Sequence, residues 1–127
     1  TSADRILEGQ RLNAEANALL KADSPKQAAV LFKRCFAYTR GLLPQRSNLA
    51  QYAVAAGQED TLIDQSQEKT VRALELACNH GLATVYLRSG QLERALSYTE
   101  QVLNSEPENV KGLFRTGQLH LKMKNIE

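Results

Sequence analysis

The chain has 127 residues, a formal net charge of +2 and a hydrophobic content of 43%. This length suits one domain with a modest core, and so small a charge gives no support to a nucleic-acid partner. No apolar run approaches the roughly 20 residues of a membrane span, so no membrane partner is expected. With only 7 Gly and 3 Pro among many strong helix formers, the composition favours an all-α fold.

Apolar periodicity and turn signals predict helices separated by one long connector. Residues 43–65 form this connector, and residues 47–56 within it are a candidate short helix. The predicted helices, in chain order, are 4–21, 25–42, 66–89, 92–104 and 108–123.

Two similar segments predict helix starts. Ser24 stands before Pro25, and Gln27 completes the pattern of a capping box. Ser105 and Pro107 repeat this pattern before the last predicted helix.

Small residues recur at intervals that indicate internal repeats. Ala83 and Gly117 are 34 positions apart, the period of tetratricopeptide (TPR) helix-turn-helix repeats. Ala16 precedes Ala83 by 67 positions, which predicts an insert of about 33 residues after the first repeat. We therefore expect an all-α fold of about two and a half TPR repeats, stacked as a right-handed superhelix. The expected single domain, 1–127, divides into repeat 1 (4–42), connector (43–65), repeat 2 (66–106) and partial repeat 3 (107–127).

Two segments resemble one TPR subgroup. Residues 72–88 are similar to the middle-repeat helix of immunophilin TPR domains, and residues 109–121 to their third-repeat helix. The run Lys111-Gly-Leu-Phe-Arg115 is the most specific part. The chain thus resembles, over nearly its whole length, the C-terminal TPR domain of large immunophilin (FKBP-type) co-chaperones.

This resemblance implies a carboxylate clamp for the Glu-Glu-Val-Asp tail of a heat-shock chaperone. The family pattern is Lys and Asn four apart, a single Asn on the middle helix, and Lys and Arg four apart. Residues four apart share a helix face, so three helices can converge on the carboxylates of a peptide. In this chain Asn17, Lys111 and Arg115 match the pattern, whereas Asn13 replaces the first Lys and Gly81 replaces the middle Asn.

Neighbouring residues complete the expected site. Lys122 extends the basic stripe of the last predicted helix. His80 lies about 100° round the helix from Gly81, so we do not expect it to replace the missing Asn. Either a bulky ligand or a neighbour packs closely on Gly81, or nothing there requires an amide. The expected peptide-binding residues are therefore Asn13, Asn17, Lys111, Arg115 and Lys122.

No metal, cofactor or catalytic site is expected. Cys78 and His80 supply two of the roughly four ligands that a structural zinc needs. No phosphate loop, nucleophile elbow or Ser/His/Asp order is present.

We therefore expect a non-catalytic, co-chaperone-like module that binds an acidic C-terminal peptide. One alternative is a TPR scaffold with a degenerate clamp that binds a different protein. Another is the targeting domain of a prolyl isomerase whose catalytic domain lies outside this sequence. The chain lacks an initiator Met and ends abruptly at Glu127, so a piece of a longer protein is expected. Two cysteines and no Asn-x-Ser/Thr sequon favour the cytoplasm. The oligomeric state and the partner's identity stay open.

Overall fold

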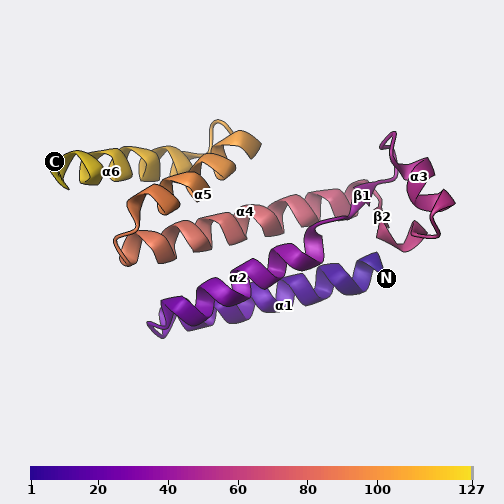
Figure 1. Cartoon of the computed structure of the whole chain (residues 1–127), viewed down its shortest axis with the longest axis horizontal. Coiled ribbons are helices and arrows are strands. Elements are labelled where there is room, and N and C mark those ends of the chain that lie inside the picture. The colour runs from indigo at the N-terminus through magenta and orange to yellow at the C-terminus, as the bar shows by residue number, and fades with distance from the viewer. Residues whose placement is uncertain (127) are drawn as a thin grey trace.

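The computed structural model describes residues 1–126 and the side chains of residues 1–124. Within that range the chain forms six α-helices, one 3-10 helix (η1) and two very short strands (Figure 1). Their bounds are α1 Ser2–Lys21, α2 Pro25–Thr39, β1 Leu43–Pro44, α3 Ala50–Ala55, η1 Glu59–Thr61, β2 Leu62–Ile63, α4 Gln65–Arg88, α5 Leu92–Ser105 and α6 Val110–Ile126.

The long helices form a stack with α4 in the middle (Figure 1). Helices α1 and α2 run antiparallel as one hairpin, α4 and α5 as the next, and α6 follows α5 in the opposite direction. Each long helix packs against the long helices before and after it in the chain, and α4 also packs against α1. The core between them is apolar and includes the fully buried Phe32, Leu82 and Leu119.

The two hairpins turn in the same way. In the first turn the Ser24 amide donates to the Leu19 carbonyl at 2.9 Å, and in the second the Gln91 amide donates to the Tyr86 carbonyl at 2.9 Å. Both pairs close the end of a helix with the 6→1 bond of a Schellman-type turn. Ser24 and Gln91 are 67 positions apart, the interval predicted between the first and second repeats.

Small buried residues obey the same interval. Ala16 and Ala83 are fully buried on the first helix of each hairpin, and Ala28 and Ala95 are fully buried on the second. Methyl side chains at these positions let the two helices of a hairpin approach closely. The sequence repeat is therefore a repeat of packing.

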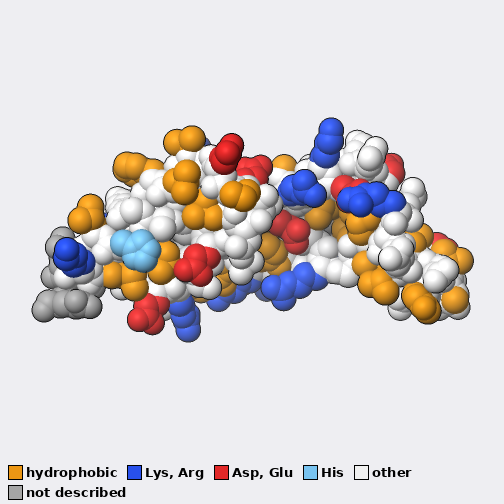
Figure 2. Space-filling view, turned by 90° about the horizontal axis from the view of Figure 1, so that it is seen from above, with side chains coloured by type: hydrophobic (Ala, Val, Ile, Leu, Met, Phe, Trp, Pro, Cys, Tyr) orange, Lys and Arg blue, Asp and Glu red, His pale blue; other side chains and the backbone are white. Residues whose placement is uncertain are grey.

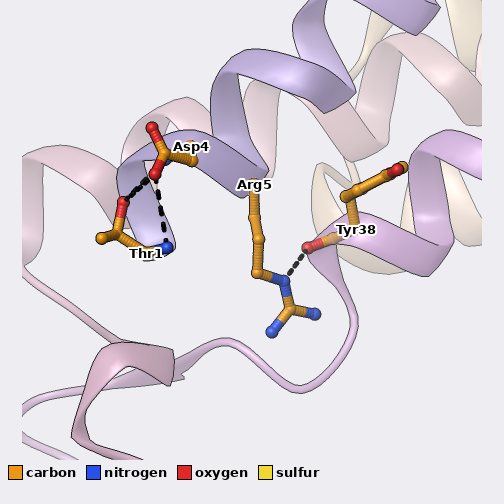
Figure 3. A network of polar contacts seen from close by, with 4 residues as sticks. All are labelled: Thr1, Asp4, Arg5 and Tyr38. Carbon is orange, nitrogen blue, oxygen red and sulfur yellow. Dashed lines mark hydrogen bonds and ion pairs between the residues drawn. The ribbon is translucent and has the colours of Figure 1, made fainter.

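The start of α1 is fastened to the end of α2 (Figure 3). Thr1 and Asp4 form a capping box at the first turn of α1. One turn later the Arg5 guanidinium donates to the carbonyls of Tyr38, at 3.0 Å, and Arg40, at 2.6 Å. A cation on these C-terminal carbonyls satisfies acceptors that the helix itself leaves without donors.

Helix α2 ends three residues before the predicted limit of 42. Arg40 is already extended, and Gly41 has a φ of +85°. A left-handed backbone suits glycine and stops a helix. The apolar residues after Gly41 continue the helical spacing, and for this reason the predicted helix was too long.

The connector folds against the start of α4. Leu43 and Pro44 pair in parallel with Leu62 and Ile63, and the predicted short helix is present as α3, Ala50–Ala55. Strands of two residues carry no periodicity, so they were not predicted. Asp64 then begins α4 through a capping box.

One of the two predicted serine caps is confirmed in position. Ser24 is the N-cap residue of α2 and Pro25 begins the helix, but the Ser24 side chain makes no capping hydrogen bond. The second predicted cap is wrong. Ser105 is the last residue of α5 rather than a cap. The start of α6 is capped by Asn109, whose side-chain oxygen accepts from the Gly112 amide at 2.8 Å.

Helix α6 buries one side and leaves large apolar residues on the other. Leu119 is fully buried, whereas Val110, Leu113, Phe114 and Leu121 are exposed. Seen from above, hydrophobic side chains gather over the α6 end of the molecule and over the connector end, with Lys and Arg side chains between them (Figure 2).

Across the described residues, no helix is both long and apolar enough to cross a membrane.

Candidate functional site

The asparagine pair on α1 is held against α4. The Asn17 side-chain amide donates to the Asn13 side-chain oxygen at 3.2 Å, and the Asn13 amide donates to the Cys78 sulfur at 3.4 Å. Asn13 is half-buried and Asn17 is exposed. The structure therefore joins these two predicted site residues, with Asn13 supporting the more accessible Asn17.

The cationic pair on α6 meets the same turn of α4. Arg115 Nη1 donates to the His80 carbonyl oxygen at 3.0 Å. Burial lowers the pKa of Arg115, although a guanidinium stays charged near neutral pH. Lys111 is exposed, one turn before Arg115 on the same face. A half-buried Arg beside an exposed Lys suits a site that pairs with carboxylates.

His80 lies beside the two cations of α6. Its half-buried side chain has its pKa lowered by burial first, then by the positive charges of Lys111 and Arg115, while Glu106 acts in the opposite direction. Both cations come from α6, so this effect on His80 depends on a contact between helices and not on the angle between residues 80 and 81.

This environment makes a pH-dependent stability effect testable. Because the pKa of His80 is lower in the folded chain than its usual 6.5, the folded state binds fewer protons than the unfolded state between those two values. The contribution of neutral His80 to the free energy of unfolding is present above about pH 6.5. It is lost as the pH falls through the pKa that His80 has in the folded chain. We expect urea unfolding to show a larger loss of stability from pH 7.5 to 5.5 in the wild type than in His80→Gln. Equal losses in the two proteins would contradict it.

The space beside Gly81 is filled by a neighbouring side chain and is not open to the groove. A Cβ placed on Gly81 would lie 2.6 Å from Cε1 and Cε2 of the Phe32 ring and closer still to Cζ. Phe32 comes from α2 and is fully buried. The ring therefore fills the space that a side chain at position 81 would need, which decides between the two explanations that the sequence left open.

The next interface differs at the equivalent positions. Thr99 lies 67 positions after Phe32, and Arg115 lies 34 positions after Gly81. The smaller Thr99 is buried on α5, and a long side chain is accommodated at Arg115. At the first interface the large Phe32 on the second helix of a repeat accompanies Gly81 on the next helix. At the following interface the small Thr99 accompanies Arg115.

A hollow lies beside Asn13. It has a volume of about 460 Å³ between α1 and α4 and is lined by residues that include Asn13, Lys69 and Ala77. Lys122, by contrast, stands seven residues beyond Arg115, about 10 Å along α6. The structure thus gives the Asn13 end of the groove room for a ligand and leaves Lys122 at its margin.

The two cysteines lie together in the core. Both are fully buried, and the neighbouring Cys78 thiol, together with burial, raises the pKa of Cys35. Thiols in this state act as small packed side chains. Among the described residues, no group of three or more His, Cys, Asp and Glu side chains is arranged to hold a metal ion.

Two known proteins described as TPR proteins are similar to this chain, one in sequence and one in structure. No protein-family model matches the sequence. Tetratricopeptide repeat protein 9C of Xenopus tropicalis is 26% identical over 121 residues, which cover 92% of this chain and 66% of that protein. A Plasmodium falciparum structure, described as the C-terminal TPR-containing domain of an FK506-binding protein, matches with a TM-score of 0.72. It is 20% identical and covers 97% of this chain and 70% of that one. The chain has a TPR fold.

The TPR fold confirms the predicted all-α stack of repeats and the resemblance to an immunophilin TPR domain. Such a fold supports a protein–protein interaction module. The first helices of successive TPR hairpins are α1, α4 and α6, and the candidate site residues of this TPR chain lie on them. The chain spans just under two thirds of the length of its Xenopus relative.

Proposed function

We propose that this TPR module holds an acidic C-terminal peptide of a partner protein in the groove of α1, α4 and α6. Lys111 and Arg115 pair with its carboxylates, and Asn17, supported by Asn13, orients the peptide backbone. Lys122 lies at the margin of this groove. The observation that carries the proposal is the placement of Arg115 on the His80 carbonyl, within one turn of the Asn13 contact at Cys78.

The likeness to an FK506-binding protein's TPR domain supports a co-chaperone role in the cytoplasm, with a heat-shock chaperone tail as the partner. A separate alternative is that the chain is the targeting domain of a prolyl isomerase whose catalytic domain lies outside this sequence. The proposed repeats are 4–42, 66–106 and 107–127, with the connector 43–65 between the first two.

The proposal is tested by titrating the protein with labelled Met-Glu-Glu-Val-Asp. A hydrogen bond to a charged group contributes about 1.5–3 kcal/mol, or roughly 10- to 150-fold in affinity. We expect Arg115→Ala to weaken binding by at least about tenfold, whereas Arg34→Ala, an exposed arginine of α2, leaves it unchanged. The same peptide with a C-terminal amide should bind as weakly as the Arg115→Ala variant binds the acid, because the terminal carboxylate is lost.

A second candidate function is a TPR groove with a degenerate clamp that binds a different protein partner. The Phe32 ring against Gly81 removes the middle amide of the clamp, and Asn13 supplies no positive charge. If the pentapeptide does not bind below about 1 mM, or if Arg34→Ala weakens it as much as Arg115→Ala does, the clamp proposal fails. This second candidate then takes its place.

A further inference from the structure

A second concave surface lies on the side of α4 away from the groove. It is a cleft of about 1030 Å³ between α2, α4 and α5. On α4 its lining includes Arg72, Asn79 and Tyr86. Asn79 follows the groove residue Ala77 by two positions, about 200° round the helix, so the cleft and the groove use opposite sides of α4.

The cleft is strongly basic. Its lining includes four cations and one carboxylate, Glu75. The cations are Lys33 of α2, Arg40 directly after α2, Arg72 of α4 and Arg94 of α5. All four cations are exposed. Over the part of the chain that the structure describes, none of them takes part in an ion pair.

The carboxylate among them is already engaged. Thr39 Oγ1 donates to Glu75 Oε2 at 3.0 Å. Glu75 is half-buried, so it lies below the exposed cations. The charge that the cleft presents to a partner is therefore positive, although the whole chain carries only +2.

A pair of stacked tyrosine rings positions two of these cations. The rings of Tyr86 and Tyr98 stack with centroids 5.6 Å apart and planes 6° from parallel. Lys33 Nζ lies 5.6 Å and Arg94 Cζ 5.5 Å from the centroid of Tyr86. Cations held near an aromatic face lose less side-chain freedom when they bind an anion.

We infer that this α2–α4–α5 cleft binds an acidic segment of a partner protein. Arg72 and Tyr86 are 14 positions apart, so the cleft runs for about 21 Å along α4. An extended peptide of about six or seven residues covers that length. Such a segment places carboxylates near Arg72 at one end and near Lys33 and Arg94 at the other. Four cations are few for a nucleic acid, whose affinity grows with each neutralised phosphate.

The test uses a fluorescein-labelled octaglutamate with an amidated C-terminus, so that it offers no terminal carboxylate to the groove. Fluorescence anisotropy should show saturable binding that weakens at least about tenfold in Arg72→Gln/Arg94→Gln. The matched control is Lys26→Gln/Arg34→Gln, which removes the same charge from exposed positions of α2 outside the cleft. This control should change the affinity by less than about twofold. Thermal unfolding of both doubles verifies that each is folded.

Three results would overturn the inference. One is no binding up to about 1 mM peptide. Another is an equal loss of affinity in the control double, which would indicate attraction to the overall charge. The third is tighter binding of an eight-residue oligouridylate, which would assign the cleft to RNA. Lys111→Ala/Arg115→Ala separates the two surfaces, because it should weaken the chaperone-type pentapeptide and leave octaglutamate binding unchanged.

Discussion

Replacing Gly81 with Ala is expected to lower the unfolding free energy by about 2–3 kcal/mol. Ala is normally the better helix former by about 1 kcal/mol, so the sign of this effect is unusual for a mid-helix Gly. Here the added methyl would overlap the Phe32 ring, and overpacking of a rigid core typically costs about 1–3 kcal/mol or more. Urea unfolding monitored by circular dichroism measures the difference.

Gly117 supplies the matched control. It lies within α6, and a Cβ placed there would meet no heavy atom within 4 Å. Gly117→Ala is therefore expected to stabilise the chain by about 0.5–1 kcal/mol. If Gly81→Ala were stabilised to the same extent, the Phe32 contact would not be the reason for glycine at position 81. A longer side chain, as in Gly81→Asn, should be worse than Ala and should not restore the clamp.

Truncating Phe32 to Ala should produce a larger loss, about 3–5 kcal/mol of unfolding free energy. The ring is fully buried between α2 and α4, and its removal costs both the transfer of the ring from water and the cavity left behind. Phe114→Ala is the matched substitution. That ring is 72% exposed on α6, so its loss should change stability by less than about 0.5 kcal/mol.

The two substitutions at the α2–α4 contact are expected to be strongly non-additive. In the Phe32→Ala background, Gly81→Ala no longer meets a ring, and its effect should become neutral or stabilising by up to about 1 kcal/mol. The double-mutant cycle would then give a coupling of about 3 kcal/mol. Additive effects would mean that the two residues destabilise the protein independently.

The helices and their repeat were predictable because they depend on local spacing. Ala16, Ala83, Ala28 and Ala95 recur at 67-residue intervals and are all fully buried. Each hairpin needs small residues at these positions so that its own two helices can pack closely. The hairpin is a short-range motif, so its rules can be recognised in one sequence.

The site was less predictable because its geometry depends on contacts between helices. No local pattern indicated that Phe32 would lie on Gly81, 49 positions later. Nor did any local pattern show that Arg115 would reach the His80 carbonyl and place positive charge beside that imidazole. The basic cleft that includes Tyr86 and Tyr98 likewise depends on contacts between helices.

The order of packing has a consequence for how the protein opens. Helix α6 packs mainly on α5, whereas α4 is covered by α1, α2 and α5. A linear stack separates at its ends for less free energy than full unfolding requires. Detachment of α6 would carry Lys111 and Arg115 away from α4 while the core around Phe32 and Leu82 stays closed. The groove is thus coupled to a sub-global opening, and a ligand that bridges α1 and α6 would also act as a clasp on the repeat array.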